Sequence, residues 1–342
     1  MKHSFKEGAL VVTSISLVNA AMGSLAAGCR ERGARFYVVG DRKSPPDFQL
    51  KGCDYLGLEK QRELPFAYAR LCPEGSYARK NIGYLQAMKE GAGFIVETDD
   101  DNHPREDFWL DRFREVNGDC VEGEGWVNAY AYFSREFIYP RGLPLQWARD
   151  PAVVRPGRKA CRAVCCPIQQ GLADGDPDVD AVYRMLYPLP FQFEKAEPLV
   201  LGRGLWCPFN SQNTTFFPEA YALLYLPAFC SFRMTDIWRS FVAQRILWTC
   251  GWGVSFHNAS VFQERNQHDL MRDFGDEIPG YLQNDAIRIR LAGLELGEGP
   301  EFIPDNLRAC YAALIEMGAV QAGEKALLEA WLGDVGACGF RP

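Results

Sequence analysis

Phe94-Ile95-Val96-Glu97-Thr98-Asp99-Asp100-Asp101-Asn102 is the most informative stretch of this chain, because it joins a short apolar strand to three consecutive carboxylates. Adjacent carboxylates repel one another and cost stability unless a cation or a partner neutralises them. Hard oxygen ligands at a strand end suit Mg²⁺ or Mn²⁺ that is bound together with a substrate's phosphates. A solvated acidic loop is the alternative. The strand before the triplet, and the helix before that strand, favour the metal site.

The segments before this stretch alternate between strand and helix patterns. Strands are expected at residues 9–15, 35–39 and 94–97, and helices at 17–32 and 80–90. Continuous apolar strands separated by helices predict a parallel sheet covered on both faces. Ligands of such sheets bind at the carboxyl ends of the strands. The residues that follow each strand are therefore the first candidates for a functional site.

The rest of the chain has weaker patterns. Residues 120–235 are rich in aromatic residues, proline and glycine, with a strand-like piece at 125–132. A helix at 236–250 and a strand at 253–257 follow. The last sixty or so residues show helical periodicity, as at 307–317 and 326–332. We expect a nucleotide-binding and catalytic domain over residues 1–275 and a helical extension over 276–342.

Composition narrows the class of protein. The chain has 342 residues, of which 47% are hydrophobic and 24% charged, and its net charge of −7 argues against general nucleic-acid binding. No apolar run approaches the roughly 18 residues of a membrane span, and no secretory signal is visible. The 12 cysteines form no C-x-x-C pair, so a zinc or redox site has no support. We therefore expect a cytoplasmic protein whose thiols are mostly reduced.

Several motifs occur in the order in which a known family carries them. The largest are Val-Val-Gly-Asp-Arg-Lys-Ser-Pro at 38–45, Lys-Asn-Ile-Gly-Tyr at 80–84, the acidic stretch 97–104, Gly-Leu-Ala-Asp-Gly-Asp-Pro-Asp-Val-Asp-Ala-Val-Tyr at 171–183, and Phe-Arg-Met-Thr-Asp-Ile-Trp-Arg at 232–239. Shorter matches lie at 11–15, 139–142 and 263–268. In these motifs the sequence resembles the STELLO-type glycosyltransferase-like proteins. More distantly, it is similar to the reversibly glycosylated polypeptides, which are UDP-arabinopyranose mutases.

The resemblance implies a fold and a substrate. It implies an α/β, GT-A-like fold in which a Rossmann-type mixed or parallel sheet is flanked by helices, with the helical C-terminal extension packed on it. It also implies a nucleotide-sugar donor, UDP-linked as the first expectation, and an Asp-rich metal motif. Mn²⁺ or Mg²⁺ would neutralise the leaving diphosphate as the glycosidic bond breaks. The resemblance says less about which sugar is moved.

The acidic triplet is the expected metal site. Strand alternation and the following turn cannot point all three carboxylates inward. We expect Asp99 and Asp101 to ligate the metal and Asp100 to contact the ribose or the sugar of the donor. His268 is a further candidate ligand, with a surface histidine as the alternative.

Other donor-binding candidates lie at element ends. Thr13, Ser14 and Asp41 follow the first two strands, where related folds hold the nucleoside. Lys80 and Asn81 open a helix, whose amides and added positive charge favour an anion such as the donor phosphate. The alternatives are ordinary helix caps, turn residues and a surface lysine.

The aspartates at 174, 176, 178 and 180 alternate in a way that mimics a calcium loop. Val179 stands where the EF-hand glycine belongs and Met185 where its glutamate belongs, which excludes that interpretation. The resemblance assigns Asp176 and Asp178 to the wall of the sugar pocket. A polar turn that caps the next helix, near residue 179, is the alternative.

The catalytic candidates are Asp236, Arg233 and Arg149. Asp236 could take the proton of an acceptor hydroxyl, although its place at a helix start also fits a simple cap. Arg233 could hold phosphate or the acceptor. In the mutases a reactive arginine carries the sugar transiently, and Arg149 lies near that position, displaced by one residue relative to the proline.

These observations predict a metal-dependent glycosyltransferase that uses a nucleotide-sugar donor. Two alternatives stay open. One is a pyranose–furanose mutase of a nucleotide sugar, and the other is a non-catalytic scaffold for glycosyl enzymes. The expected partners are the donor and an acceptor, either a glycan or a small molecule, with no nucleic acid and no membrane span. The sequence leaves open whether the protein forms a homo-oligomer.

Overall fold

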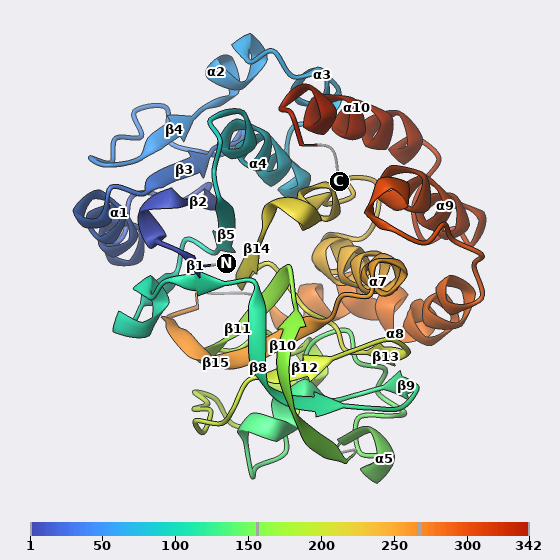
Figure 1. The fold of residues 1–342 in the computed structure, drawn as a ribbon. Coiled ribbons are helices and arrows are strands. Elements are labelled where there is room, and N and C mark those ends of the chain that lie inside the picture. Colours follow the sequence, from blue (N-terminus) through green and yellow to red (C-terminus); the bar gives the residue numbers. More distant parts are fainter. Residues whose placement is uncertain (1, 155–156, 266–268, 341–342) are drawn as a thin grey trace.

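A large central sheet organises the molecule (Figure 1). The computed structural model describes residues 2–154, 157–265 and 269–340. The strands of the main sheet are β2 (Gly8–Thr13), β3 (Arg35–Val39), β4 (Asp54–Leu56), β5 (Phe94–Thr98), β6 (Asn102–Pro104), β8 (Glu115–Val121), β10 (Arg158–Cys165), β11 (Ile168–Gly175), β12 (Leu199–Leu201), β14 (Asn213–Phe216) and β15 (Val254–Gln263). Within the described residues their order is β10-β8-β12-β15-β11-β14-β5-β2-β3-β4, and β6 pairs with β15.

Two further pairs of short strands lie outside this sheet. They are β1 (Lys2–His3) with β7 (Arg112–Phe113), and β9 (Gly125–Trp126) with β13 (Leu205–Trp206). The helices are α1 (Ala20–Arg32), α2 (Leu58–Glu63), α3 (Ala67–Leu71), α4 (Lys80–Lys89), α5 (Pro151–Val154), α6 (Ala181–Leu186), α7 (Thr235–Leu247), α8 (Leu270–Ala292), α9 (Ile303–Glu316) and α10 (Glu324–Ala337).

The N-terminal half of the sheet is parallel and covered on both faces, as predicted. Strands β4, β3, β2 and β5 run parallel. Leu10 and Val12 of β2 belong to the core that includes α1, whereas Val11 belongs to the core that includes α4. Helix α4 approaches closely because Gly83 has no side chain, since a Cβ there would lie 2.6 Å from Val11 Cγ1. The carboxyl ends of β2, β3 and β5 therefore meet at one edge.

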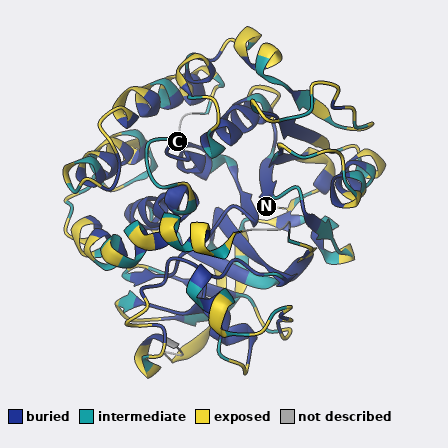
Figure 2. Ribbon diagram, turned by 180° about the vertical axis from the view of Figure 1, so that it is seen from behind, coloured by how far each residue is buried: buried dark blue, intermediate teal, exposed yellow. Residues whose placement is uncertain are grey.

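The remaining strands make the sheet mixed. Strand β14 runs antiparallel to β5 and to β11, and β11 runs parallel to β15. Figure 2 shows the central strands buried and the outer faces of the surrounding helices exposed. The predicted α/β fold, with a mixed sheet flanked by helices, is confirmed by this arrangement.

Helices dominate the C-terminal part. Every residue of α7 is buried, and α8, α9 and α10 follow one another along one side of the molecule (Figure 1). Helices α8 and α9 pack on α7, and α10 packs on α3 and α9. The predicted helical C-terminal extension is confirmed. Helix α8 runs through the expected boundary at 275 and 276, and the division into two domains there stays a prediction.

Three element predictions need correction. The helix expected at 17–32 begins at Ala20, because the Asn19 side chain accepts a hydrogen bond from the Met22 amide and caps it. The piece at 125–132 is a two-residue strand followed by a 3₁₀ turn over Ala129–Phe133. The strand expected at 253–257 continues to Gln263, because its end pairs with β6 and with the end of β11.

The cysteines are mostly free, as expected, with one exception. Cys120 and Cys161 form a disulfide that joins β8 and β10 at the far edge of the sheet. Ten other cysteines are free. Among the described helices, none combines the length and the apolar character that a membrane span requires.

A buried ion pair joins the sheet to α7. Arg239 donates two hydrogen bonds to the Glu97 carboxylate, at 2.6 and 2.8 Å, and both side chains are almost wholly buried. Tyr84 of α4 also donates to Glu97. Bidentate charge-assisted contacts of this kind compensate the cost of taking two charges out of water. The pair therefore fixes α7 against β5.

We expect Arg239→Met to lower the free energy of unfolding by about 3–5 kcal/mol, because it leaves the Glu97 carboxylate buried without its cation. Urea denaturation followed by circular dichroism measures this. The control is Glu329→Gln, which breaks the exposed pair with Arg308 and should change stability by less than about 1 kcal/mol. Equal effects of the two substitutions would contradict the role given to the buried pair.

Candidate functional site

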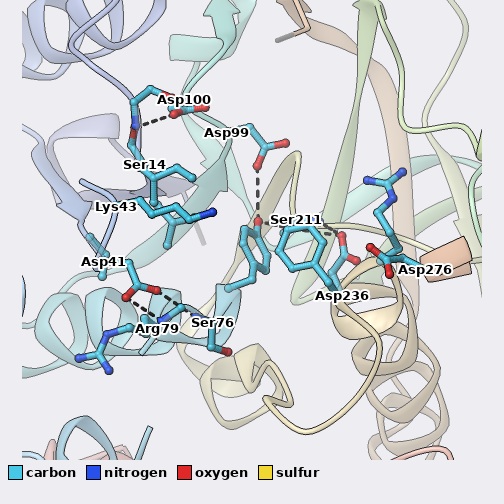
Figure 3. A pocket seen from close by; sticks show the side chains of 18 of the residues that line it. Ser14, Asp41, Lys43, Ser76, Arg79, Asp99, Asp100, Ser211, Asp236 and Asp276 are labelled. Carbon is cyan, nitrogen blue, oxygen red and sulfur yellow. Dashed lines mark hydrogen bonds between the residues drawn. The ribbon is translucent and has the colours of Figure 1, made fainter. Parts of the chain in front are cut away.

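A cleft of about 930 Å³ opens at the carboxyl ends of β2, β3 and β5 (Figure 3). This is the edge at which parallel sheets bind ligands, and the volume suits a nucleotide-sized molecule. Its walls come from the loops after these strands, the turn before α4, and the beginnings of α7 and α8. The lining residues are Thr13, Ser14, Ile15, Ser16, Val39, Gly40, Asp41, Arg42, Lys43, Gly75, Ser76, Tyr77, Arg79, Asp99, Asp100, Arg141, Ser211, Phe232, Arg233, Asp236, Asp269, Arg272, Asp273 and Asp276.

The expected nucleoside residues lie at one end of the cleft. Thr13, Ser14 and Asp41 all line it, and Figure 3 shows Ser14, Asp41 and Asp100 on the same side. The Asp41 carboxylate accepts hydrogen bonds from the amides of Gly75 and Ser76, at 2.8 and 2.9 Å. Asp41 therefore fixes the loop before α4, in addition to facing the cleft.

Two cations next to Asp41 lie at the predicted ligand-binding edge, although no site role was predicted for them. Arg42 and Lys43 are exposed, line the cleft, and have side chains without a hydrogen bond or ion pair to any described residue. Their positive charge is therefore available to an anionic ligand. The signal in the sequence was the basic pair directly after the second strand.

Asp99 lies in the middle of the cleft. Its Oδ1 atom accepts a hydrogen bond from the Tyr77 hydroxyl at 3.4 Å and lies 3.7 Å from Lys80 Nζ. Burial raises the pKa of Asp99 to about 7; Lys80 opposes the rise, and the charges of Asp101 and Asp100 add to it. The triplet thus concentrates negative charge that Lys80 alone does not balance.

The other two carboxylates of the triplet point in different directions. Asp100 lines the cleft and accepts a hydrogen bond of 2.6 Å from the Ser14 hydroxyl. Asp101 is buried, and its Oδ1 atom accepts from Gln263 Nε2 at 2.9 Å, so it does not line the cleft. The structure therefore brings Asp99 and Asp100 together at the cleft, in place of the expected Asp99 and Asp101.

The third expected ligand, His268, lies outside the described residues. Among the residues that are described, no three or more His, Cys, Asp or Glu side chains converge to hold a metal ion by themselves. Two carboxylates supplemented by substrate phosphates are nevertheless a common way to bind Mg²⁺. The donor set that Asp99 and Asp100 offer is compatible with such a site.

Lys80 and Asn81 are placed differently from expectation. A 3₁₀ turn over Tyr77–Arg79 precedes α4, so its first amides do not open into the cleft. Lys80 is fully buried, and its ammonium donates to Thr98 O at 2.8 Å and Tyr77 Oη at 2.9 Å. Asn81 is also buried and binds the Leu226 backbone. Lys80 supports the floor of the cleft, and Asn81 does not line it.

Asp236 belongs to a buried network at the other end. Arg141 Nη2 donates to the Asp236 carboxylate at 3.0 and 3.1 Å, and Ser211 donates to Asp236 Oδ2 from both its amide and its hydroxyl, at 3.2 Å each. Arg141 also forms two bonds of 2.7 Å to Asp178. Burial raises the pKa of Asp178, but the charge and hydrogen bonds of Arg141, together with the charges of Arg233 and Arg184, outweigh it and hold that pKa below its usual value. Asp236 and Arg141 line the cleft, whereas Asp178 does not line it and holds Arg141 from behind.

The remaining candidates divide in the same way. Arg233 lines the cleft and donates to Glu277 at 3.0 Å. Asp176 pairs with Arg184 and lies 3.8 Å from Arg265, away from the cleft lining. Arg149 is exposed, lies over the Phe137 ring at 4.3 Å, and does not line the cleft. The structure therefore does not bring Arg149 together with the other catalytic candidates.

Several residues without a predicted site role are brought into the cleft by the fold. Tyr77 and Ser211 line the cleft and link Asp99 to Asp236 through hydrogen bonds, and Phe232 packs against Tyr77. The first turns of α8 contribute a rim of charged side chains. Those rim residues are Asp269, Arg272, Asp273 and Asp276. Each reaches the cleft through contacts between elements far apart in the chain, which local patterns do not show.

The fold and the site define a class: an α/β protein with a charged cleft at the carboxyl edge of its parallel strands. A family model described as STELLO glycosyltransferases matches residues 233–341. Probable glycosyltransferase STELLO2 of Arabidopsis thaliana is 30% identical over 255 residues, which are 67% of this chain and 32% of that protein. Probable glycosyltransferase STELLO1 of the same plant is 30% identical over 64% of this chain and 31% of its own length.

The chain belongs to the STELLO-type family of glycosyltransferase-like proteins, which confirms the resemblance found in its motifs. It spans about a third of the length of these two curated relatives. Two solved structures also align with 82% of the chain at 11% identity: a mycobacterial protein, over 74% of its length with a TM-score of 0.39, and M. tuberculosis glucosyl-3-phosphoglycerate synthase, over 80% with a TM-score of 0.40. Scores this low carry no argument about function.

A buried carboxyl behind the cleft makes stability depend on pH. Asp180 caps α6 by accepting from the Tyr183 amide at 2.7 Å and also accepts from the Tyr139 hydroxyl at 3.1 Å. Burial raises the pKa of Asp180 to about 7, and the charge of Glu277 adds to the rise. Because the folded state then binds the proton more tightly than the unfolded chain, Asp180 lowers stability progressively as the pH rises from about 4 to about 7.

We expect Asp180→Asn to remove this dependence while keeping an oxygen for the helix cap. The free energy of unfolding of the variant minus that of wild type should increase by up to a few kcal/mol between pH 5 and pH 8, so the variant becomes the relatively more stable protein. Urea denaturation at several pH values measures it. Asp47→Asn, at an exposed position, is the control and should leave the pH profile unchanged. A constant difference between Asp180→Asn and wild type would contradict the assignment.

Proposed function

We propose that the cleft binds a nucleotide sugar, with a UDP-linked sugar as the first candidate, and transfers the sugar to an acceptor hydroxyl. One observation carries this proposal. At the carboxyl edge of the sheet, the Asp99 and Asp100 carboxylates face the same cleft as the uncommitted cations Arg42 and Lys43. A diphosphate with a divalent cation satisfies both signs of charge at once. The family of the chain supports a sugar as the group transferred.

A divalent cation, Mn²⁺ or Mg²⁺, fits this donor set. Asp99 and Asp100 would hold it, because both line the cleft and both carry oxygens of the kind these ions prefer. When bound, the cation supplies positive charge that stabilises the departing diphosphate. Asp101 accepts a hydrogen bond from Gln263 and is given no direct contact with the metal or the donor.

Other residues of the cleft would support the metal site, bind the phosphates and accept the proton. Tyr77 and Lys80 hold Asp99 in place: the Tyr77 hydroxyl lies 3.4 Å and Lys80 Nζ 3.7 Å from Asp99 Oδ1, and Lys80 also donates to Tyr77 at 2.9 Å. Arg42 and Lys43 attract and orient the phosphates as the donor enters. At the other end, Asp236 accepts the proton of the acceptor hydroxyl, and Arg141 and Ser211 hold its carboxylate in position. Positioning of both substrates and compensation of the developing phosphate charge account for the catalysis.

We expect Lys43→Ala to weaken UDP binding by about 3- to 10-fold at low salt, with a smaller effect at high salt, because one screened charge is lost. Isothermal titration calorimetry with UDP and Mn²⁺ measures this. Lys51→Ala, at an exposed position outside the cleft lining, is the matched control. Equal affinities for the two variants would contradict the phosphate role of Lys43.

Asp99→Asn should abolish the part of UDP binding that depends on Mn²⁺, because the amide is a poorer metal ligand than the carboxylate. UDP is titrated into each protein once with Mn²⁺ and once with a chelator, and Asp47→Asn is the control for Asp99→Asn. Binding of UDP that is equally tight with and without metal in the wild type would show that the cleft uses no divalent cation.

Asp236→Asn should separate binding from transfer. The amide keeps the size of the side chain but loses the base, so we expect UDP affinity to stay within about 3-fold of wild type while sugar transfer falls by about 100-fold or more. Transfer is followed as release of UDP from UDP-glucose in the presence of a mixture of acceptor sugars. Undiminished transfer would exclude Asp236 as the base.

A further inference from the structure

An aromatic ring stands exposed inside the cleft. The side chain of Phe232 is 58% exposed and lines the cavity, whereas Met234, two residues on, is buried in the core. The ring meets Tyr77 edge to face, with the centroids 5.9 Å apart and the planes at 79°. Tyr77 is in turn bonded to Asp99 and to Ser211, which holds Asp236. The Phe232 ring therefore contacts the hydrogen-bonded chain that links Asp99 of the proposed donor site to the proposed base.

Exposure of a single apolar side chain on an open surface needs no explanation. Phe232 differs because its exposed ring lines a concave cleft together with polar and charged side chains. Pockets of this composition, with an aromatic surface and a few convergent polar groups, bind ligands that have both an apolar face and hydrogen-bonding groups. The fold gains little from this ring, since most of its surface is left in water.

The polar groups near the ring are mainly acidic. Asp236 and the α8 residues Asp269, Asp273 and Asp276 line this end, and Figure 3 shows Asp236 and Asp276 on the side opposite Asp41. Asp236 is paired with Arg141, Asp273 with Arg265, and Arg233 with Glu277. Among the described residues, the rim charges outside these pairs are the carboxylates of Asp269 and Asp276 and the exposed cation Arg272. Ionised carboxylates accept hydrogen bonds and repel anions. This end therefore favours a neutral ligand with several hydroxyl donors.

A sugar ring combines these properties, because one face presents C–H groups and its rim presents hydroxyls. We infer that Phe232 is the stacking platform of an acceptor subsite for a neutral carbohydrate, with the α8 carboxylates accepting hydrogen bonds from its hydroxyls. The inference rests on the proposed function, since it places the acceptor next to Asp236. It identifies the acceptor as an uncharged sugar or oligosaccharide and excludes a phosphorylated or carboxylated acceptor.

The test measures carbohydrate binding directly, without requiring transfer. Saturation-transfer NMR on the full chain, with and without UDP and Mn²⁺, gives relative affinities for neutral trisaccharides of glucose, galactose, mannose and xylose, and for glucose 6-phosphate. The variants are Phe232→Ala, which removes the ring, and Phe232→Tyr, which keeps it. Phe113→Ala is the matched control, because Phe113 is 51% exposed on β7 and does not line the cleft.

We expect at least one neutral trisaccharide to bind, with affinity reduced about tenfold in Phe232→Ala and kept within about 3-fold in Phe232→Tyr and Phe113→Ala. Titration with UDP should give the same affinity for all four proteins. If the wild type binds no UDP but still binds sugar in a way that depends on Phe232, the proposed transferase function is overturned and the carbohydrate site is retained. Three results would overturn the inference: sugar affinity that is unchanged in Phe232→Ala, no binding of any neutral sugar, or tighter binding of glucose 6-phosphate than of the neutral sugars.

Discussion

The buried pair between Glu97 and Arg239 is the contact on which the geometry of the cleft depends. Glu97 lies two residues before Asp99 on β5, and Arg239 lies three residues after Asp236 on α7. The pair thus joins the element that ends in the proposed donor site to the element that begins with the proposed base. Two buried charges tolerate little displacement, because any separation leaves each of them without compensation. The distance between the two ends of the cleft is set in this way.

Further charged contacts extend this constraint to each end of the cleft. Lys80 holds Asp99 from below on one side, and Arg141 joins Asp236 to Asp178 on the other. Lys80 and Arg141 are buried and already paired with these carboxylates, so their charge holds the carboxylates in place and is not available to a ligand. Arg42 and Lys43 are the opposite case, exposed and uncommitted. The cleft therefore separates the charges that build the site from the charges that are free to meet an anion.

Much of the fold was predictable because its signals are local. Apolar strands, the αL glycine Gly33 that ends α1, and the alternation of strand and helix indicated a parallel sheet, and the carboxyl edge of that sheet indicated where the cleft would lie. The same reasoning placed Ser14, Asp41, Asp99 and Asp236, all of which line the cleft. Helix starts were less well predicted, since a single cap such as Asn19 moves the boundary by three residues.

What the sequence did not show is carried by contacts between distant residues. Asp101 turns from the cleft because Gln263, on β15, donates to it. Asn81 looked like a ligand residue at a helix start, yet it binds the Leu226 backbone. Phe232 and the α8 carboxylates enter the cleft only because α7 and α8 pack together there. No local pattern encodes these pairings, and each one changes the role of a residue.

The most direct test of the account is hydrogen–deuterium exchange of the full chain with UDP and Mn²⁺, compared with the chain alone. We expect slower exchange in the segments that build the donor end of the cleft, at residues 13–16, 40–43, 75–77 and 99–100. The control region is the second cavity, of about 430 Å³, whose wall includes Arg203 and Trp252 and whose exchange should not change. Protection at the second cavity instead, or no protection in the cleft at saturating ligand, would contradict the account.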